Sequence, residues 1–278
     1  MYKIEKGDIV GRKSYEKDIV FKVSKIICRN GKTIAVLEGI IERIIADSEI
    51  TDLELIEKKK AKEIIDNFNK RINAKIYQVK EENEKYLYKT NTRRKDKYIS
   101  GKILHLDGDR KYSERSNNYY KKVGLNAIVR NIEEYRQPQV VSRFLELYNP
   151  DILVITGHDG MIRKGIKYND IYNYKNSKYF IKTVQEARRF DKLHNKDLVI
   201  FAGACQSYFE AIISAGANFA SSPARILIDF LDPLLVAQKV AFTEKYKYIT
   251  IDDIAYKLRD GKDGIGGIGA NGKLKSVL

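Results

Sequence analysis

The sequence predicts an α/β protein, with a mostly parallel sheet covered by helices on both faces and a small SH3-like β-barrel before it. Two apolar runs, residues 152–155 and 198–201, carry the prediction of the sheet. Short runs of this kind, bounded by turn residues, are typical of strands buried on both faces of a parallel sheet. The third observation is a change of pattern along the chain, from closely spaced β-branched runs to alternating strand and helix signals.

Three segments follow from that change of pattern. Residues 1–56 contain four or five short β-branched runs and an Asn30-Gly31 hairpin signal, which predict the SH3-like barrel. Such barrels commonly bind partners or nucleic acid, but a fold alone does not establish a function. Residues 57–98 are a charged linker, helical in its first half and a looser arm in its second. Residues 99–278 form the α/β domain.

Composition and charge narrow the class of protein. The chain has 278 residues, 43% of them apolar, and a formal charge of +15. We expect no membrane span and no secretory signal, and the two cysteines fit a reducing, intracellular compartment. A charge of +15 would suit nucleic acid or acidic partners. Because the basic residues are spread along the chain, a solvated surface is the favoured interpretation and nucleic acid is an unlikely partner.

The α/β domain is predicted to alternate strands and helices, as repeated βαβ units do. The expected strands cover residues 103–107, 126–132, 152–155, 198–201 and 218–223. The expected helices cover residues 113–123, 139–148, 177–193, 206–215 and 233–246. The glycine-rich stretch 264–269 is expected to be flexible, and it is a weak signal for phosphate binding because no βαβ unit surrounds it.

One reactive side chain follows each of the two apolar runs. His158 comes after the first run and Cys205 after the second, 47 residues later, which leaves room for a helical crossover between neighbouring strands. A lone His or a buried Cys is more often structural. A thiol and an imidazole at adjacent strand ends form the minimal dyad for a cysteine nucleophile, so the pair favours catalysis.

The surroundings of Cys205 add to this interpretation. A helix that begins at Gln206 would direct its N-terminal N–H groups at the sulfur and lower the thiol pKa. Backbone N–H groups near the two strand ends could also stabilise an oxyanion. The candidates are those of Cys205, Asp159 and Gly160.

Asp107 and Asp109 leave the first strand of the domain at the same sheet edge. One of these carboxylates could bind a substrate guanidinium, or the Asp-Gly sequence could simply form a turn. If neither Asp binds substrate, the pocket would lie near Ser221 and Ser222. Zinc motifs are absent from the sequence, and we expect neither a metal nor another cofactor.

These motifs carry a resemblance to known families. The two apolar blocks, one followed by His158 and the other by Ala204-Cys205, resemble the caspase, gingipain, clostripain and separase group of cysteine proteases. The usual His-Gly pair of that group is His158-Asp159-Gly160 here. Nearly the whole chain, including residues 7–15, 106–109, 156–160 and 203–207, resembles the YabG family of sporulation-specific proteases.

The resemblance implies a caspase-like catalytic domain with Cys205 as the nucleophile. It also implies that the substrates are spore coat and cortex-related proteins, cleaved after Arg or, less often, Lys. The expected location is the cytoplasm of the sporulating cell or the spore coat. The competing functions are a non-enzymatic scaffold, a nucleic-acid-binding protein and a response-regulator-like domain, the last prompted by Asp107.

The linker offers sites at which such an enzyme could cut itself. Arg71, Arg93 and Arg94 lie in this charged segment, and exposed polar segments are preferred sites of cleavage. Tethering places these residues at high effective concentration near the cleft. We therefore expect fragments that begin at Ile72, Arg94 or Lys95.

Overall fold

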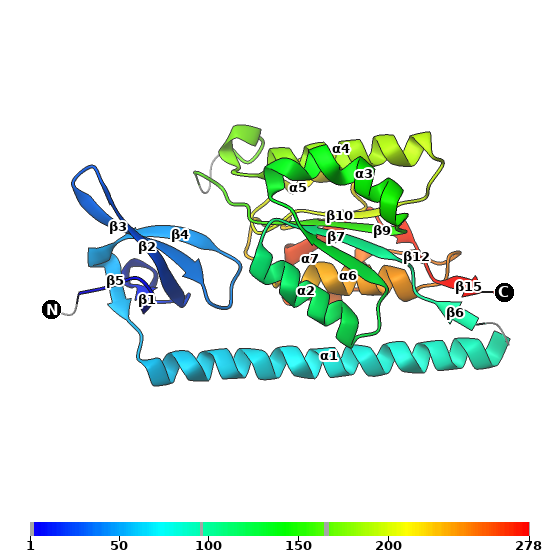
Figure 1. Cartoon of the computed structure of the whole chain (residues 1–278), viewed down its shortest axis with the longest axis horizontal. Helices are drawn as coiled ribbons and strands as arrows, with labels where there is room; N and C mark the ends of the chain where they lie inside the picture. Colours follow the sequence, from blue (N-terminus) through cyan, green and yellow to red (C-terminus); the bar gives the residue numbers. More distant parts are fainter. Residues whose placement is uncertain (1–2, 95–96, 164–166, 278) are drawn as a thin grey trace. The chain divides into compact units, whose positions relative to one another are not determined.

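A computed structural model describes residues 3–94, 97–163 and 167–277, with the side chains of residues 89–94 and 277 left out (Figure 1). The chain divides into two compact units, Met1–Lys75 and Ile76–Leu278. The division falls inside one helix, α1 (Lys58–Arg94). The domain boundaries after residues 56 and 98 stay predictions.

The first unit contains a five-stranded antiparallel sheet in the order β4-β3-β2-β1-β5. Its strands are β1 (Ile9–Arg12), β2 (Phe21–Arg29), β3 (Lys32–Gly39), β4 (Ile45–Glu49) and β5 (Leu53–Leu55). Asn30 and Gly31 both have positive φ, 52° and 74°, and they form the predicted hairpin turn between β2 and β3. The antiparallel sheet agrees with the sequence, while its closure into an SH3-like barrel stays a prediction.

Helix α1 runs through both halves of the charged linker. Its second half is helical because it packs on the second unit, with Ile76 and Val79 buried. The buried Asn83 donates to the Val123 carbonyl and accepts from Gln238 at 2.6 Å. Of the expected cleavage positions, Arg71 lies within this helix; the side chains of Arg93 and Arg94, and all of Lys95, lie outside the described residues.

The second unit contains a six-stranded sheet in the order β13-β11-β10-β9-β7-β8. Its strands are β7 (Ile103–Asp107), β8 (Ala127–Asn131), β9 (Ile152–Thr156), β10 (Val199–Ala202), β11 (Phe219–Ser221) and β13 (Ile265–Gly267). The first five are parallel, and β13 joins β11 antiparallel. The predicted mostly parallel sheet is therefore confirmed.

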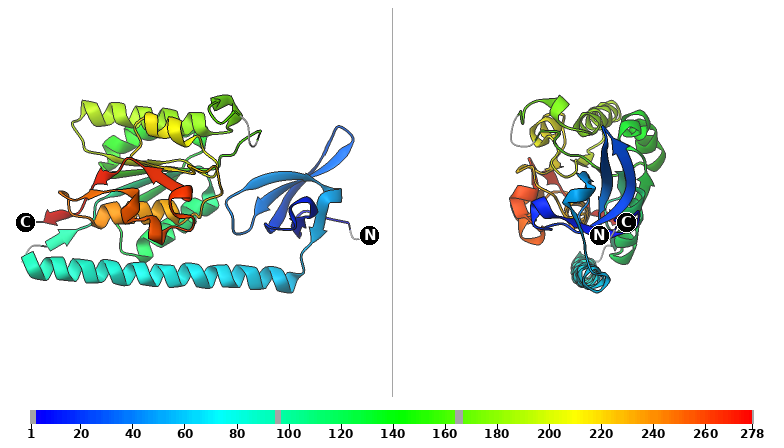
Figure 2. Two further views of the ribbon diagram at one scale, coloured as in Figure 1. Left: turned by 180° about the vertical axis from the view of Figure 1, so that it is seen from behind. Right: turned by 90° about the vertical axis from the view of Figure 1, so that its left-hand side faces the viewer.

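Helices cover both faces of this sheet (Figure 1). Figure 2 shows the same layers from behind. One face carries α3 (Gln137–Tyr148), α4 (Ser177–Leu193) and α5 (Phe209–Ser214), and the other carries α2 (Arg110–Lys122) and α6 (Asp232–Phe242). Alternate strand residues face alternate layers, so Leu104, Leu106, Leu153 and Ile155 pack in the core against α3, α4 and α5. Every residue of β7, β9 and β10 is buried. The apolar runs in β9 and β10 predict this burial, whereas β7 also buries the polar His105 and Asp107.

The glycine-rich stretch near the C-terminus corrects one expectation. Residues 264–269 were expected to be flexible, but they contribute β13, which pairs with β11 through Ser221↔Ile265 and Phe219↔Gly267. A Cβ at Gly267 would lie 2.3 Å from the Asn218 carbonyl oxygen. The glycine therefore allows a close strand approach and is not a sign of flexibility.

Candidate active site

His158 follows β9 and is fixed from three sides. Its Nε2 lies 2.6 Å from Oδ2 of Asp109, its N–H donates to Oε1 of Glu134 at 2.6 Å, and its carbonyl accepts from Nδ2 of Asn176 at 2.8 Å. The preceding Gly157 leaves room for Glu134, because a Cβ there would lie 2.3 Å from Oε1. The imidazole is 22% exposed, so it is both held and accessible.

The two carboxylates at the carboxyl end of β7 both bond to other groups of the protein. Asp109 caps α2 by accepting the N–H of Tyr112 at 3.1 Å, and its other oxygen meets His158. Asp107 is fully buried and accepts from Oγ1 of Thr156 at 2.8 Å and from the N–H of Asp109 at 2.8 Å. The structure thus places Asp109 against the imidazole. Asp107 instead holds the turn at Asp109 and the neighbouring strand at Thr156.

Cys205 follows β10 and is covered. The residue is 2% exposed, and its Sγ accepts the backbone N–H of Ile228 at 3.4 Å. Ile228 belongs to the irregular segment between β11 and α6, residues 222–231, which we call the covering segment. The candidate nucleophile is therefore covered by the backbone of Ile228, a residue that no motif indicated.

The predicted helix start behind Cys205 is wrong. Helix α5 begins at Phe209 instead of Gln206, because Gln206 has a φ of 57° and the chain turns before it becomes helical. A helix that starts four residues after Cys205 gives no support to the expected dipole effect on the sulfur, since this effect fades within the first turn.

The His158 and Cys205 loops lie at the same sheet edge. Strands β9 and β10 are parallel neighbours, with Ile155 opposite Ala202, and both loops begin directly after them. Oδ2 of Asp159 accepts from Oγ of Ser207 at 3.0 Å, and the N–H of Met161 donates to Oε1 of Gln206 at 3.4 Å. Of the predicted oxyanion donors, Gly160 gives its N–H to Oδ1 of Asp159 at 2.9 Å.

Aromatic rings and a hydroxyl connect the covering segment to both loops. The Tyr112 ring lies edge-on to His158, with centroids 6.4 Å apart, and 6.0 Å from the ring of Phe230. Oγ of Ser222 accepts the N–H of Gln206 at 3.1 Å. Oγ of Ser221 is buried and has no hydrogen-bond partner among the described residues.

Sequence reasoning missed Glu134, Asn176 and Ile228. Glu134 and Ile228 are distant from the motifs in the chain, and neither belongs to a recognisable pattern. Asn176 precedes a predicted helix, where its side chain could have been taken for a cap. Only the tertiary fold shows that it holds His158.

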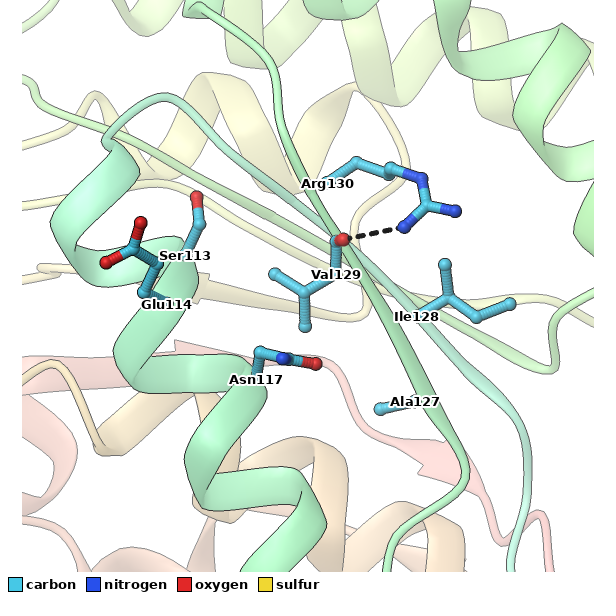
Figure 3. Close-up of a pocket in the computed structure, with 7 residues that line it drawn as sticks. All are labelled: Ser113, Glu114, Asn117, Ala127, Ile128, Val129 and Arg130. Atoms are coloured by element: carbon cyan, nitrogen blue, oxygen red, sulfur yellow. Dashed lines mark hydrogen bonds between the residues drawn. The ribbon is translucent and has the colours of Figure 1, made fainter.

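Two cavities of the second unit lie away from the candidate site. One cavity of about 310 Å³ lies between α2 and β8 and is lined by Ser113, Glu114, Asn117 and residues 127–130 (Figure 3). A larger one, of about 630 Å³, is lined by residues that include Lys273 and Tyr246. Neither contains a predicted site residue, and among the described residues no three His, Cys, Asp or Glu side chains are grouped to hold a metal.

The fold and the site define a class of protein. Ligands of open parallel α/β sheets bind at the carboxyl ends of the strands, and here an imidazole, a carboxylate and a thiol gather there. The chain is therefore an α/β protein with a candidate active site at the carboxyl edge of its parallel sheet. No described helix has the length and apolar character to cross a membrane.

The chain belongs to the YabG peptidase U57 family, because the sequence model of this family matches residues 5–278. It is 38% identical over 279 aligned residues to the sporulation-specific protease YabG of Bacillus subtilis (strain 168), covering 97% of this chain and 96% of that protein. The resemblance found in the sequence is thereby confirmed, and the protein is a peptidase. A receiver domain of the Arabidopsis thaliana histidine kinase CKI1, complexed with Mg²⁺, aligns with 42% of this chain and 79% of its own. With 13% identity and a TM-score of 0.28, this alignment supports no likeness.

Proposed function

We propose that the protein is a cysteine endopeptidase with Cys205 as its nucleophile and His158 as its general acid and base. The observation that carries the proposal is the imidazole held against Asp109 at 2.6 Å, on the strand next to the one that delivers Cys205. A positioned base oriented by a third group is the arrangement that activates a nucleophile.

The contact with Asp109 assigns roles to the two imidazole nitrogens. With Nε2 bonded to the carboxylate, Nδ1 takes the proton from Sγ of Cys205. The thiolate attacks the scissile carbonyl, His158 returns the proton to the leaving amine, and water then hydrolyses the acyl-enzyme. The oxyanion would be stabilised by backbone N–H groups of Cys205 and Asp159, with Gly160 available only after it releases Oδ1 of Asp159.

Cleavage after Arg or Lys is the proposed specificity. Asp109 remains the first candidate to bind the basic side chain, because it is less buried than Asp107 at the end of β7. A substrate guanidinium would share Asp109 with His158, and Asp107 would have to leave its buried partners. The region of Ser221 and Ser222, close to Cys205 through the contact of Ser222 with Gln206, is the alternative.

The proposed setting is the sporulating cell. Similarity to a sporulation-specific protease supports this setting. We propose spore coat and cortex-related proteins as the substrates, cut in the cytoplasm or at the coat. The caspase-like character of the sheet and the SH3-like barrel belong to the same proposal. Self-processing after Arg71 would require α1 to unwind locally, because a continuous helix does not fit an extended substrate site.

Labelling with an arginine-based thiol-reactive probe tests the proposal. The wild-type protein should lose its peptidase activity as Cys205 becomes labelled, and peptide mapping should find no comparable label at Cys28, which is exposed. Cys205→Ala and His158→Ala should abolish turnover while circular dichroism shows the fold intact. Substantial turnover by folded Cys205→Ala would refute the assignment of the nucleophile.

A further inference from the structure

Building on the proposed cysteine peptidase, we propose that Asp159 is the positioning residue that fixes the His158 loop against the Cys205 loop. It adjoins His158 in the chain, and its carboxylate bonds to groups from three separate parts of the domain. Asp159 replaces the glycine expected directly after the histidine, so its side chain is an addition that the dyad alone does not explain.

The contacts of this carboxylate are numerous. Oδ1 accepts the N–H groups of Asn176 at 2.8 Å and Gly160 at 2.9 Å. Oδ2 accepts the hydroxyls of Ser207, at 3.0 Å, and Ser177. One partly buried side chain thus ties its own loop, the start of α4 and the loop of Cys205 together.

The two serines extend the link on the cysteine side. Oγ of Ser207 accepts the N–H of Ala204, the residue before Cys205, at 2.9 Å. Oγ of Ser177 accepts the N–H of Tyr208 at 2.8 Å. Through two hydroxyls, Asp159 therefore holds the backbone on both sides of Cys205, while its own backbone carries His158.

The chemistry of the site requires a carboxylate. Each serine hydroxyl already accepts an N–H group, so each has its hydrogen left to donate, and Oδ2 receives both. An amide at this position has one oxygen, which could face either the two hydroxyls or the N–H groups of Asn176 and Gly160, so its NH₂ group would meet donors on the other side. Burial raises the pKa of Asp159 to about 6, while these hydrogen bonds oppose the rise. At neutral pH the group is therefore the ionised acceptor that the hydroxyls need.

The loss of a residue that positions the reacting groups should lower kcat. A misplacement of about 1 Å between reacting groups can cost roughly 100-fold in rate. Because the Asp159 carboxylate bonds to protein groups of both loops, we expect its loss to act on the approach of His158 to Cys205 and to leave substrate binding largely unchanged.

The test compares Asp159→Asn with Ser207→Ala and with a matched control, Asp170→Asn. Asp170 also accepts a backbone N–H, that of Tyr172 at 3.0 Å, but no hydrogen bond among the described residues joins its side chain to His158, Asp159 or Cys205. Active sites are titrated with an irreversible thiol-reactive probe, so that kcat refers to folded enzyme, and the melting temperature is measured for each variant. We expect kcat to fall about 10- to 100-fold in Asp159→Asn and about 10-fold in Ser207→Ala, with KM within about twofold. Asp170→Asn should match the wild type.

The outcomes separate this inference from the proposed function. If Cys205→Ala is inactive while Asp159→Asn keeps the wild-type kcat per active site, the positioning role is wrong and the cysteine peptidase stands. If Cys205→Ala keeps its turnover, the proposed function fails, and the positioning role fails with it. If Asp159→Asn does not fold, Ser207→Ala decides, and an unchanged kcat there overturns the role.

Discussion

The two loops that carry the proposed dyad differ in how ready they are for catalysis. His158 is partly exposed and held by Asp109, Glu134 and Asn176. Cys205 is 2% exposed, and its sulfur already accepts the N–H of Ile228. The base is set in place, whereas the thiol is covered by backbone that a substrate has to displace.

This difference separates chemistry from access. The residues that orient the imidazole lie in the turn between β7 and α2 and in the segments before α3 and α4. The residues that cover the sulfur belong to the covering segment, residues 222–231, which has no helix or strand of its own. Changes in the first group should lower the rate of the chemical step, and changes in the second should alter the exposure of Cys205.

Removing the charge beside His158 should have the largest effect. Asp109→Asn leaves a neutral partner at Nε2, so the imidazole loses the group that orients it and stabilises its charged form. We expect kcat/KM to fall about 100- to 1,000-fold. Glu114→Gln, on an exposed part of the same helix α2, serves as the control and should stay near wild type. A normal rate together with a lost Arg preference would instead assign Asp109 to substrate binding.

Asp232, the first residue of α6 after the covering segment, should make the stability of the protein depend on pH. Burial, followed by the charge of Asp229, raises the pKa of Asp232 to about 7, and Asp232 accepts the N–H of Asp229 at 3.3 Å. Because the folded pKa is above the unfolded value of 3.8, this group contributes stability that is fully present below pH 3.8 and is lost as the pH rises through 7. Between pH 5 and 8 the loss should be roughly 2–3 kcal/mol.

Asp232→Asn should remove this part of the pH dependence. Denaturant unfolding at pH 5 and pH 8 would measure it, with Asp252→Asn, an exposed partner of Lys262, as the control. Equal slopes of stability against pH in the wild type and in Asp232→Asn would contradict the assignment.

Loosening the covering segment should have the smallest effect of the three. Arg225 anchors it by donating from Nε to the Tyr174 hydroxyl at 2.9 Å and by pairing with Glu210. Without these contacts the segment should open more often, so we expect iodoacetamide to alkylate Cys205 about 10-fold faster in Arg225→Ala. Arg189→Ala, which removes an exposed arginine paired with Glu186, is the control. An unchanged alkylation rate in Arg225→Ala would show that Arg225 does not limit access.

The sequence predicted where His158 and Cys205 lie in the fold better than it predicted the residues that they contact. Apolar runs of four residues defined β9 and β10, and their ends placed His158 and Cys205 at one edge. The pairing of Asp109 with His158 depends on the turn that makes Asp109 the cap of α2, and α2 begins three residues earlier than its apolar pattern indicated. Ile228 meets Cys205 across 23 positions of the chain, after α5 and β11, and it lies in a segment without helix or strand, so periodicity cannot predict the contact.

The edge of the sheet at β8 has a consequence for association between molecules. The N–H of Ile103 donates to the Asn126 carbonyl, and the N–H of Ile132 donates to the Asp107 carbonyl. The even-numbered residues of this stretch therefore direct their backbone groups at β7, and the carbonyl of Val129 faces away from β7. Arg130 donates to this outward carbonyl at 3.1 Å (Figure 3). The Tyr148 hydroxyl accepts from the same guanidinium at 2.8 Å. An incoming strand would need the same carbonyl, and exposed edges of this kind are templates for aggregation. One arginine side chain thus protects the border of the sheet, and a short residue in its place would leave that border open to self-association at high protein concentration.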